Sequence, residues 1–344
     1  VMMYYYICIG EDYVLSNLPD ELQILRAKCD VSTERIHSDF LNQIIRHGKI
    51  EKNSIFIYLV SCDINMTAKI FKRYQEAFLF CVCACIDLLE KIREKEYQKT
   101  RRFKHNITTL AANILQEIYK LVSQDELLKG PKQLERIKEI IHSNSDEAGL
   151  TFLKILKNAN LMKAEFDVYE IFNLDSPYLD FANHPAHKII LLTINPFWLE
   201  FIEKKIYINI DSFSDTIYAD YKTISVTLCH IFENATKYIA KNTELHIYFT
   251  SDDNYINIIF EMVSLKVYED EIQKIFLENY SGILAKEYDL AGNGLGMYIV
   301  KKLVEFNNGK ITFLNNCNGT AFKYDGIEYE KNKIILSLPK EEKK

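Results

Sequence analysis

The stretch Gly292-Asn-Gly-Leu-Gly-Met297 places three glycines at alternate positions, directly before an apolar run with helical spacing. Glycine lets the backbone approach a phosphate closely, and the free N–H groups at a helix start attract anions. A dinucleotide fingerprint would need a third glycine at Met297 and a strand just before the loop, but residues 286–291 do not have a strand pattern. The sequence therefore predicts a phosphate-binding loop that is not a dinucleotide site.

Two segments upstream of this loop help to interpret it. Residues 230–238, His-Ile-Phe-Glu-Asn-Ala-Thr-Lys-Tyr, lie on a helix predicted over 221–241, and residues 103–109, Phe-Lys-His-Asn-Ile-Thr-Thr, lie in a long helical stretch. In this order and spacing the three segments resemble the histidine box, the asparagine box and the glycine-rich lid box of sensor histidine kinases. The resemblance covers roughly residues 90–340.

The resemblance implies that ATP and Mg²⁺ bind between the second and third boxes. Asn234 would hold the magnesium ion that bridges the phosphates, and Lys237 would approach the phosphates. Magnesium accepts few, hard oxygen ligands, so one amide oxygen together with water and phosphate is sufficient. His230 stands where the family has an earlier asparagine. The implied cofactor-binding residues are Asn234, Lys237, Tyr238, Gly292, Gly294, Leu295 and Gly296, with Asn234 as the metal ligand.

The implied phosphoacceptor is His105. It lies two positions from each of the apolar residues Phe103 and Ile107, which places it roughly opposite the apolar face of the helix and exposed to solvent. The family usually has an acidic residue next to this histidine, where this chain has Asn106. Thr109 matches the place where related kinases position a water for dephosphorylation. His105, Asn106 and Thr109 are the predicted catalytic residues.

One departure from the family concerns the adenine. Between the two nucleotide boxes the family has an Asp-x-Gly-x-Gly segment whose aspartate reads the adenine amine, and here Met262-Val-Ser-Leu-Lys266 replaces it. Loss of that carboxylate should lower base selectivity, since a buried polar pair is removed. Glu261 is one residue away, but strand alternation points it to the other face.

Three functions follow from these features. The first is a histidine kinase that autophosphorylates a histidine from Mg-ATP and passes the phosphoryl group to a response-regulator aspartate. The alternative is a histidine phosphotransfer or scaffold protein with a degenerate, non-hydrolysing nucleotide domain. A chaperone-like ATPase without a phosphohistidine leaves the His105 helix unexplained.

Three domains are expected along the chain. Residues 1–63 form a small α/β input or interaction unit, with strands from Met2 and from Ser54 and helix-like spacing over 19–47. Residues 64–163 contain a helix from about 65 to 123 and a second one that opens at Gly130-Pro131, has a weak point at Gly149 and runs towards Leu161. The first helix carries a coiled-coil seam formed by Phe71, Tyr74, Phe78, Cys81, Cys85, Leu88 and Ile92.

Two antiparallel helices cannot close a core alone, so residues 64–163 predict a homodimer with a four-helix bundle. Residues 164–344 predict the third domain, with strands near 206–210, 245–249, 255–260, 310–313 and 333–339 and helices near 185–204, 221–241 and 296–307. The fold class is an α+β multidomain protein whose C-terminal α/β sandwich resembles the GHKL ATP-binding fold of histidine kinases, type II topoisomerases and mismatch-repair ATPases.

Composition limits partners and location. The 344 residues carry a net charge of −6, which argues against nucleic acid as the main partner. The eight cysteines include no CxxC pair, which is typical of a reducing compartment. The most apolar run, from Ala77 to Leu89, is shorter than the roughly 20 residues that span a bilayer, and Glu11 and Asp12 interrupt the apolar start. A cytoplasmic protein without membrane insertion is expected.

Overall fold

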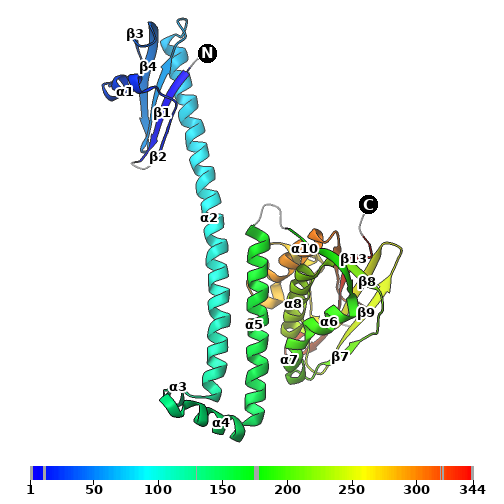
Figure 1. Cartoon of the computed structure of the whole chain (residues 1–344). Helices are drawn as coiled ribbons and strands as arrows, with labels where there is room; N and C mark the ends of the chain where they lie inside the picture. The colour runs from blue at the N-terminus through cyan, green and yellow to red at the C-terminus, as the bar shows by residue number, and fades with distance from the viewer. Residues whose placement is uncertain are drawn as a thin grey trace. The chain divides into compact units, whose positions relative to one another are not determined.

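The computed structural model describes residues 3–10, 13–128, 130–173, 178–317, 319 and 321–341 (Figure 1). The chain divides into two compact units, Val1–Arg101 and Arg102–Lys344, and helix α2 (Ala68–Leu121) runs from the first into the second. Within the described ranges, no helix has an apolar stretch long enough to cross a membrane.

The first unit is built on a five-stranded antiparallel sheet with the order β2-β1-β5-β4-β3. Helix α1 (Asp20–Ala27) covers one face, where Leu22 packs with Tyr58 of the sheet, and the first turns of α2 cover the other through Phe71. The strands are β1 (Met3–Ile9), β2 (Tyr13–Ser16), β3 (Glu34–Ser38), β4 (Gln43–Lys52) and β5 (Ile55–Ser61).

The helix-like spacing predicted over 19–47 is wrong beyond α1. Residues 34–52 form the hairpin of β3 and β4, in which Ile45 is buried and Ile44 is exposed, so the burial alternates with the period of a strand. Asn42 takes a left-handed conformation, φ 47°, at the turn between the strands. The first strand begins at Met3; Met2, Glu11 and Asp12 lie outside the described residues.

The second unit begins with a helical hairpin. The C-terminal part of α2 runs antiparallel to α5 (Ser145–Asn173): Phe103 stacks on Tyr169 at 4.1 Å between ring centroids, and Lys154 Nζ lies 3.6 Å from Glu117 Oε2. The connection contains α3 (Gln124–Leu127), the 3₁₀ turn η1 (Gly130–Lys132) and α4 (Gln133–Ser143).

The helix predicted from Gly130 breaks at Asn144 and not at Gly149, which lies inside α5. The Asn144 amide donates to the Ile140 carbonyl at 3.1 Å, and the Asn144 carbonyl accepts the Ala148 N–H at 2.9 Å. Asn144 therefore ends one helix and begins the next. Helix α5 continues to Asn173, so the boundary predicted at 163/164 falls within a helix.

The rest of the unit is an α/β sandwich, as predicted. A mainly antiparallel sheet has the order β11-β13-β10-β9-β7, with β12 paired to β13. Strands β6 and β8 form a separate pair that was not predicted from the sequence. The strands are β6 (Phe181–Pro185), β7 (Tyr207–Ile210), β8 (Thr216–Asp220), β9 (Glu244–Ser251), β10 (Tyr255–Leu265), β11 (Lys310–Leu314), β12 (Phe322–Tyr324) and β13 (Ile327–Pro339).

Helices cover one face of this sheet. The predicted helix 185–204 is interrupted at Asn195-Pro196, because proline lacks the N–H that a helix interior needs. The helical segments are α6 (Ala186–Ile194), η2 (Asn195–Phe197), α7 (Trp198–Glu203), α8 (Tyr221–Tyr238), η3 (Glu269–Glu271), η4 (Lys274–Phe276), α9 (Ile283–Glu287) and α10 (Gly296–Phe306).

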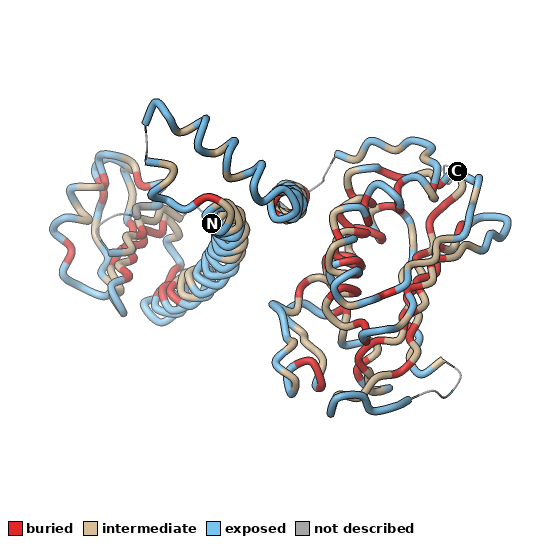
Figure 2. Tube along the Cα trace, turned by 90° about the horizontal axis from the view of Figure 1, so that it is seen from below, coloured by how far each residue is buried: buried red, intermediate tan, exposed pale blue. Residues whose placement is uncertain are grey.

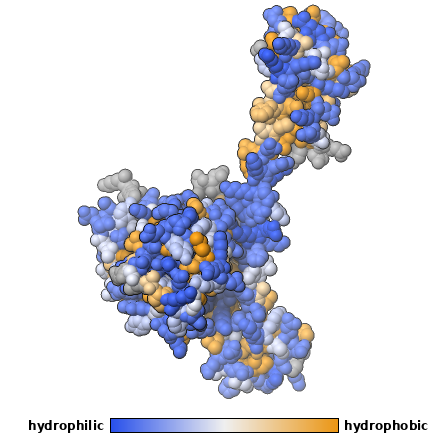
Figure 3. Space-filling view, turned by 180° about the vertical axis from the view of Figure 1, so that it is seen from behind, coloured by the Kyte–Doolittle hydropathy of each residue, from blue (hydrophilic) through white to orange (hydrophobic). Residues whose placement is uncertain are grey.

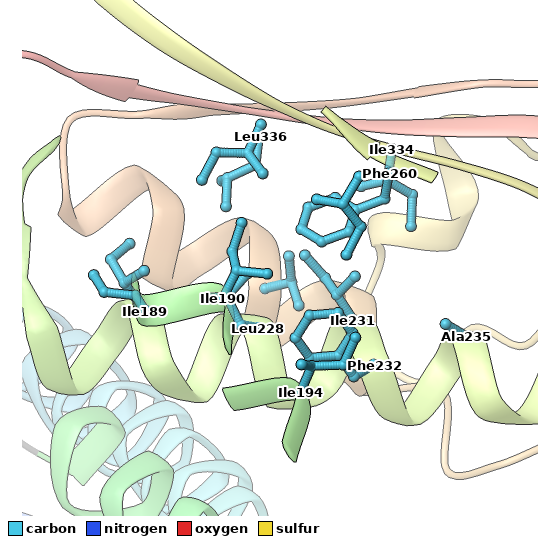
Figure 4. Packing of buried hydrophobic residues seen from close by; sticks show 14 of the residues in the cluster. Ile189, Ile190, Ile194, Leu228, Ile231, Phe232, Ala235, Phe260, Ile334 and Leu336 are labelled. Atoms are coloured by element: carbon cyan, nitrogen blue, oxygen red, sulfur yellow. The ribbon is translucent and has the colours of Figure 1, made fainter. Parts of the chain in front are cut away.

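The core of the sandwich lies between the sheet and helices α6 and α8. Figure 4 shows Ile190 from α6 and Ile231 and Phe232 from α8 facing Phe260 and Leu336 of the sheet, and all five are fully buried. Buried residues line the inner side of both layers (Figure 2). This packing fixes α8, which carries the asparagine box, against a rigid sheet.

Candidate functional site

A buried polar network sets the position of helix α8. The Asp220 carboxylate caps the helix by accepting the Thr223 N–H at 2.7 Å, and the Asp220 N–H donates to the Asn307 side chain at 2.8 Å. The Asn307 amide also donates to Thr223 Oγ1 at 2.7 Å. Because Asn307 follows α10, the network ties the helix of the asparagine box to the helix of the glycine box. None of these residues was predicted from the sequence to take part in the site.

The glycine box lies directly on the asparagine box. A Cβ placed on Gly296 would be 3.3 Å from the Asn234 amide nitrogen, and a Cβ on Gly292 would be 3.1 Å from Lys237 Nζ. Burial lowers the pKa of Lys237, and the nearby Glu233 carboxylate opposes that change. The structure thus brings together an amide, an ammonium group and the backbone of a helix start, a combination suited to phosphate.

The other two predicted cofactor residues have different surroundings. Leu295 is buried against α5 and α10, so only its backbone, at the start of α10, is available to a ligand. Tyr238 is partly buried next to Leu265 and Leu284, with Lys237 Nζ 5.5 Å from its ring centroid. Burial raises the pKa of the Tyr238 phenol, so it stays a neutral hydrogen-bonding group at neutral pH.

Gly294 needs to be glycine for two reasons. Its φ of +66° lies in the left-handed region, and a Cβ would meet the backbone of Asn279 and Tyr280 at 2.7 Å. The segment it packs against is held by Glu271, which is buried and accepts hydrogen bonds from the Tyr280 hydroxyl at 2.8 Å and the Ile283 N–H at 2.7 Å. This role of Glu271 was not predicted, because Glu269 and Asp270 directly precede it and the sequence does not show which of the three acidic side chains is buried.

The histidine box contacts the glycine box. His105 and Thr109 are exposed, whereas Phe103 is partly buried against α5, as the helical spacing predicted. The Asn293 amide donates to the Asn106 side-chain oxygen at 3.3 Å. The Thr109 hydroxyl donates to the His105 carbonyl at 2.9 Å, which leaves the lone pairs of its oxygen available as acceptors.

The segment that the sequence comparison with the family aligns with its adenine-reading box is a strand. Strand β10 continues to Leu265, which pairs with Tyr329 of β13, and the buried Asn332 amide donates to Ser264 Oγ at 3.0 Å. Met262 is 5% exposed and belongs to the core. No glycine interrupts the strand, and the residue expected in the place of the carboxylate, Met262, is apolar.

Glu261 cannot easily replace that carboxylate. It forms ion pairs with Lys331 and, at 2.7 Å, with Lys333. Burial alone would raise the pKa of Glu261, but hydrogen bonds from the two lysines outweigh it and lower the pKa below its usual value. As strand alternation predicted, Glu261 lies on the other side of β10 from the buried Met262.

The donor set fits a metal ion carried by nucleotide phosphates. Asn234 offers a hard amide oxygen, and His230, one helical turn earlier, has a buried Nε2 atom without a hydrogen-bond partner. Among the described residues no group of three or more His, Cys, Asp or Glu side chains could hold a metal. The remaining ligands would have to be phosphate oxygens and water, which Mg²⁺ commonly retains.

Comparisons with known proteins agree with this geometry. Residues 219–341 match the model of the histidine kinase-, DNA gyrase B-, and HSP90-like ATPase family. The chain is 24% identical over 231 residues to the sensor protein RprX of Bacteroides fragilis strain YCH46, a match that covers 65% of this chain and 41% of RprX. The chain therefore spans about two fifths of the length of that relative.

Solved structures of histidine kinases are also similar to parts of the chain. The catalytic domain of ThkA matches 47% of this chain and 99% of its own at 19% identity and a TM-score of 0.39. Acinetobacter baumannii AdeS matches 70% of this chain and 98% of its own, at 14% identity and a TM-score of 0.40. Full-length ShkA in complex with AMPPNP matches 70% of this chain and 45% of its own, at 17% identity and a TM-score of 0.43.

The ATPase family model covers the asparagine and glycine boxes, and the curated relative is a sensor protein. Residues 219–341 therefore match an ATPase domain of the histidine kinase-, DNA gyrase B-, and HSP90-like type, and the chain is similar to a sensor protein.

Proposed function

We propose that this chain autophosphorylates His105 from Mg-ATP and passes the phosphoryl group to a response-regulator aspartate. The observation that supports the proposal most directly is the contact between Asn293 and Asn106. It places the glycine box beside the histidine box, while the same glycine box lies on Asn234 and Lys237. One loop therefore touches both the predicted phosphate site and the neighbour of the predicted acceptor.

The side chains supply positioning and charge. His105 attacks the γ-phosphorus through a ring nitrogen, the bond to the ADP oxygen breaks, and the ring proton passes to solvent, because Asn106 cannot accept it. Lys237 and the N–H groups at the start of α10 stabilise the phosphate charge. Bound magnesium would neutralise part of the same charge. Thr109, one turn after His105, orients a water that hydrolyses the phosphoaspartate of the receiver domain to aspartate and inorganic phosphate, since its hydroxyl oxygen can accept a hydrogen bond from that water.

A direct experiment tests this reaction. The full chain incubated with γ-labelled ATP and Mg²⁺ should acquire label that is lost in mild acid and kept in base, as expected for phosphate on a ring nitrogen. Label that survives acid would place phosphate on a hydroxyl instead. The absence of any label at millimolar ATP would favour the phosphotransfer or scaffold alternative.

That alternative is supported by the adenine segment. A continuous β10 with the buried Met262 gives the base no carboxylate to bind, so discrimination between bases should be weak. In a competition titration we expect GTP to bind within about tenfold of ATP, a difference of about 1.4 kcal/mol. A preference for ATP of a hundredfold or more would mean that another side chain reads the base.

The same proposal includes a homodimer. The hairpin of α2 and α5 leaves Leu115, Phe152 and Leu153 exposed, each by more than 40% of its surface. Two hairpins packed together would cover them. In the N-terminal part of α2 the seam residues Tyr74, Cys81, Cys85, Leu88 and Ile92 are exposed as well. Figure 3 shows apolar surface over this part of the first unit.

Two seam residues have another environment. Phe71 and Phe78 pack on the N-terminal sheet, so this sheet already occupies part of the predicted seam.

The proposed partners of the chain are a second copy of itself and a receiver domain. Nucleic acid is not among the proposed partners, and the proposed location of the protein is the cytoplasm. Residues 1–63, 64–163 and 164–344 are the proposed input, dimerisation and ATP-binding domains.

A further inference from the structure

His230 is a buried polar residue that the proposed reaction does not use. It is only 7% exposed, on α8, and its Nε2 atom is buried without a hydrogen-bond partner. A ring nitrogen left without a partner in the protein interior destabilises the fold. A buried polar atom of this kind calls for a partner that the protein itself does not supply, such as an ordered water or an ion.

The place of His230 indicates which group this is. His230 and Asn234 are four residues apart on α8, so their side chains leave the same face of the helix about 5–6 Å apart. Asn234 is next to Gly296 at the start of α10, where the phosphates are proposed to lie. A ligand that reaches Asn234 from the phosphates therefore comes within one helical turn of His230.

The second ring nitrogen has a carboxylate as its neighbour. His230 Nδ1 lies 3.6 Å from Glu233 Oε2, and Glu233 is half exposed. A tautomer with its proton on Nδ1 points that proton at the carboxylate and leaves the Nε2 lone pair available. Histidines that bind metals commonly hold their other N–H against a carboxylate in this way, which fixes the ring and raises its basicity.

We propose, resting on the nucleotide site inferred above, that His230 Nε2 and Asn234 Oδ1 together ligate the nucleotide-borne cation, which gives this chain a preference for Mn²⁺ over Mg²⁺. An imidazole nitrogen is a softer ligand than an amide oxygen. It favours first-row transition-metal ions, whereas Mg²⁺ favours oxygen donors. Phosphate oxygens and water complete the coordination shell of either ion.

The test uses the full chain with a non-hydrolysable ATP analogue and either Mn²⁺ or Mg²⁺. Pulsed electron paramagnetic resonance of the Mn²⁺ complex should show coupling to an imidazole nitrogen in the wild-type protein. The analogue should bind about tenfold more tightly with Mn²⁺ than with Mg²⁺, and His230→Asn should remove both the coupling and most of this preference.

A matched control is available in His184. Its Nε2 is also buried without a partner, but it contacts Tyr221 at the first turn of α8, nine residues and roughly 13 Å from His230. His184→Asn should keep the coupling and the Mn²⁺ preference. Equal thermal midpoints of the three proteins without ligand would show that the variants are folded.

The outcomes separate this inference from the proposed function. Analogue binding with no imidazole coupling in the wild-type protein would overturn the ligation by His230 and leave the ATP site in place. An unchanged metal preference in His230→Asn would do the same. No analogue binding with either metal would overturn both proposals. The spectroscopic measurement on the wild-type protein needs no variant, so it decides the matter even if His230→Asn misfolds.

Discussion

Replacing His105 with glutamine is expected to reduce labelling from γ-labelled ATP to background. His105 is exposed on α2, two residues after the partly buried Phe103, so its removal should leave the packing of the hairpin unchanged. Glutamine keeps a similar length and a good helix propensity but has no nucleophilic ring nitrogen. Transfer of label to an added receiver domain should stop as well, since no phosphohistidine forms.

The control for this substitution is His142→Gln. His142 is also an exposed histidine on a helix of the second unit, in the last turn of α4, and its replacement should leave labelling intact. Thr109→Ala should keep most of the labelling while receiver phosphate persists longer, because the proposed role of its hydroxyl is to orient the water that hydrolyses the receiver's phosphoaspartate and not to assist the attack of His105. If His105→Gln still acquired acid-labile label, the acceptor would be another residue and the central assignment would be wrong.

The sequence predicted the helices and strands of the sandwich well because each has a clear period. Strand β10 alternates buried Ile256, Ile258 and Phe260 with less buried neighbours, and α8 buries one side through Leu228 and Ile231. The N-terminal hairpin was harder. Over 34–52 the polar residues outnumber the apolar ones, and only the packing of Ile45 against α1 shows which period applies.

Only those parts of the site that belong to a sequence motif were predicted. The glycine and asparagine boxes meet as expected from the resemblance, but nothing local in sequence pairs Asp220 with Asn307, 87 residues away. Glu271 is similar, because its partners Tyr280 and Ile283 come from the following loop. Such contacts depend on tertiary packing, and a single sequence contains no local pattern from which they can be predicted.

The replacement Asn234→Ala is expected to abolish binding of an ATP analogue in the presence of a divalent cation. The Asn234 side-chain amide lies against Gly296 and offers the oxygen proposed to bind the cation, and alanine removes this amide without adding bulk. Alanine is also the better helix former, so α8 should remain intact. An analogue at about 100 times its Kd stabilises the wild-type fold by about 2.7 kcal/mol, which appears as a rise in the thermal midpoint.

For Asn234→Ala this rise should disappear while the midpoint without ligand stays close to that of the wild-type protein. Asn160→Ala is the matched control: Asn160 is likewise a partly buried asparagine on a helix, α5, and its amide donates only to the Leu156 carbonyl of the preceding turn at 3.0 Å. That variant should keep the full ligand-induced rise. Equal rises in wild type and Asn234→Ala would show that the phosphates are held by other groups, with Lys237 and the start of α10 as the remaining candidates. Because Gly292 lies on Lys237 and Gly296 on Asn234, such a result would move the site by one helical turn along α8 and leave the contact between Asn293 and Asn106 in place.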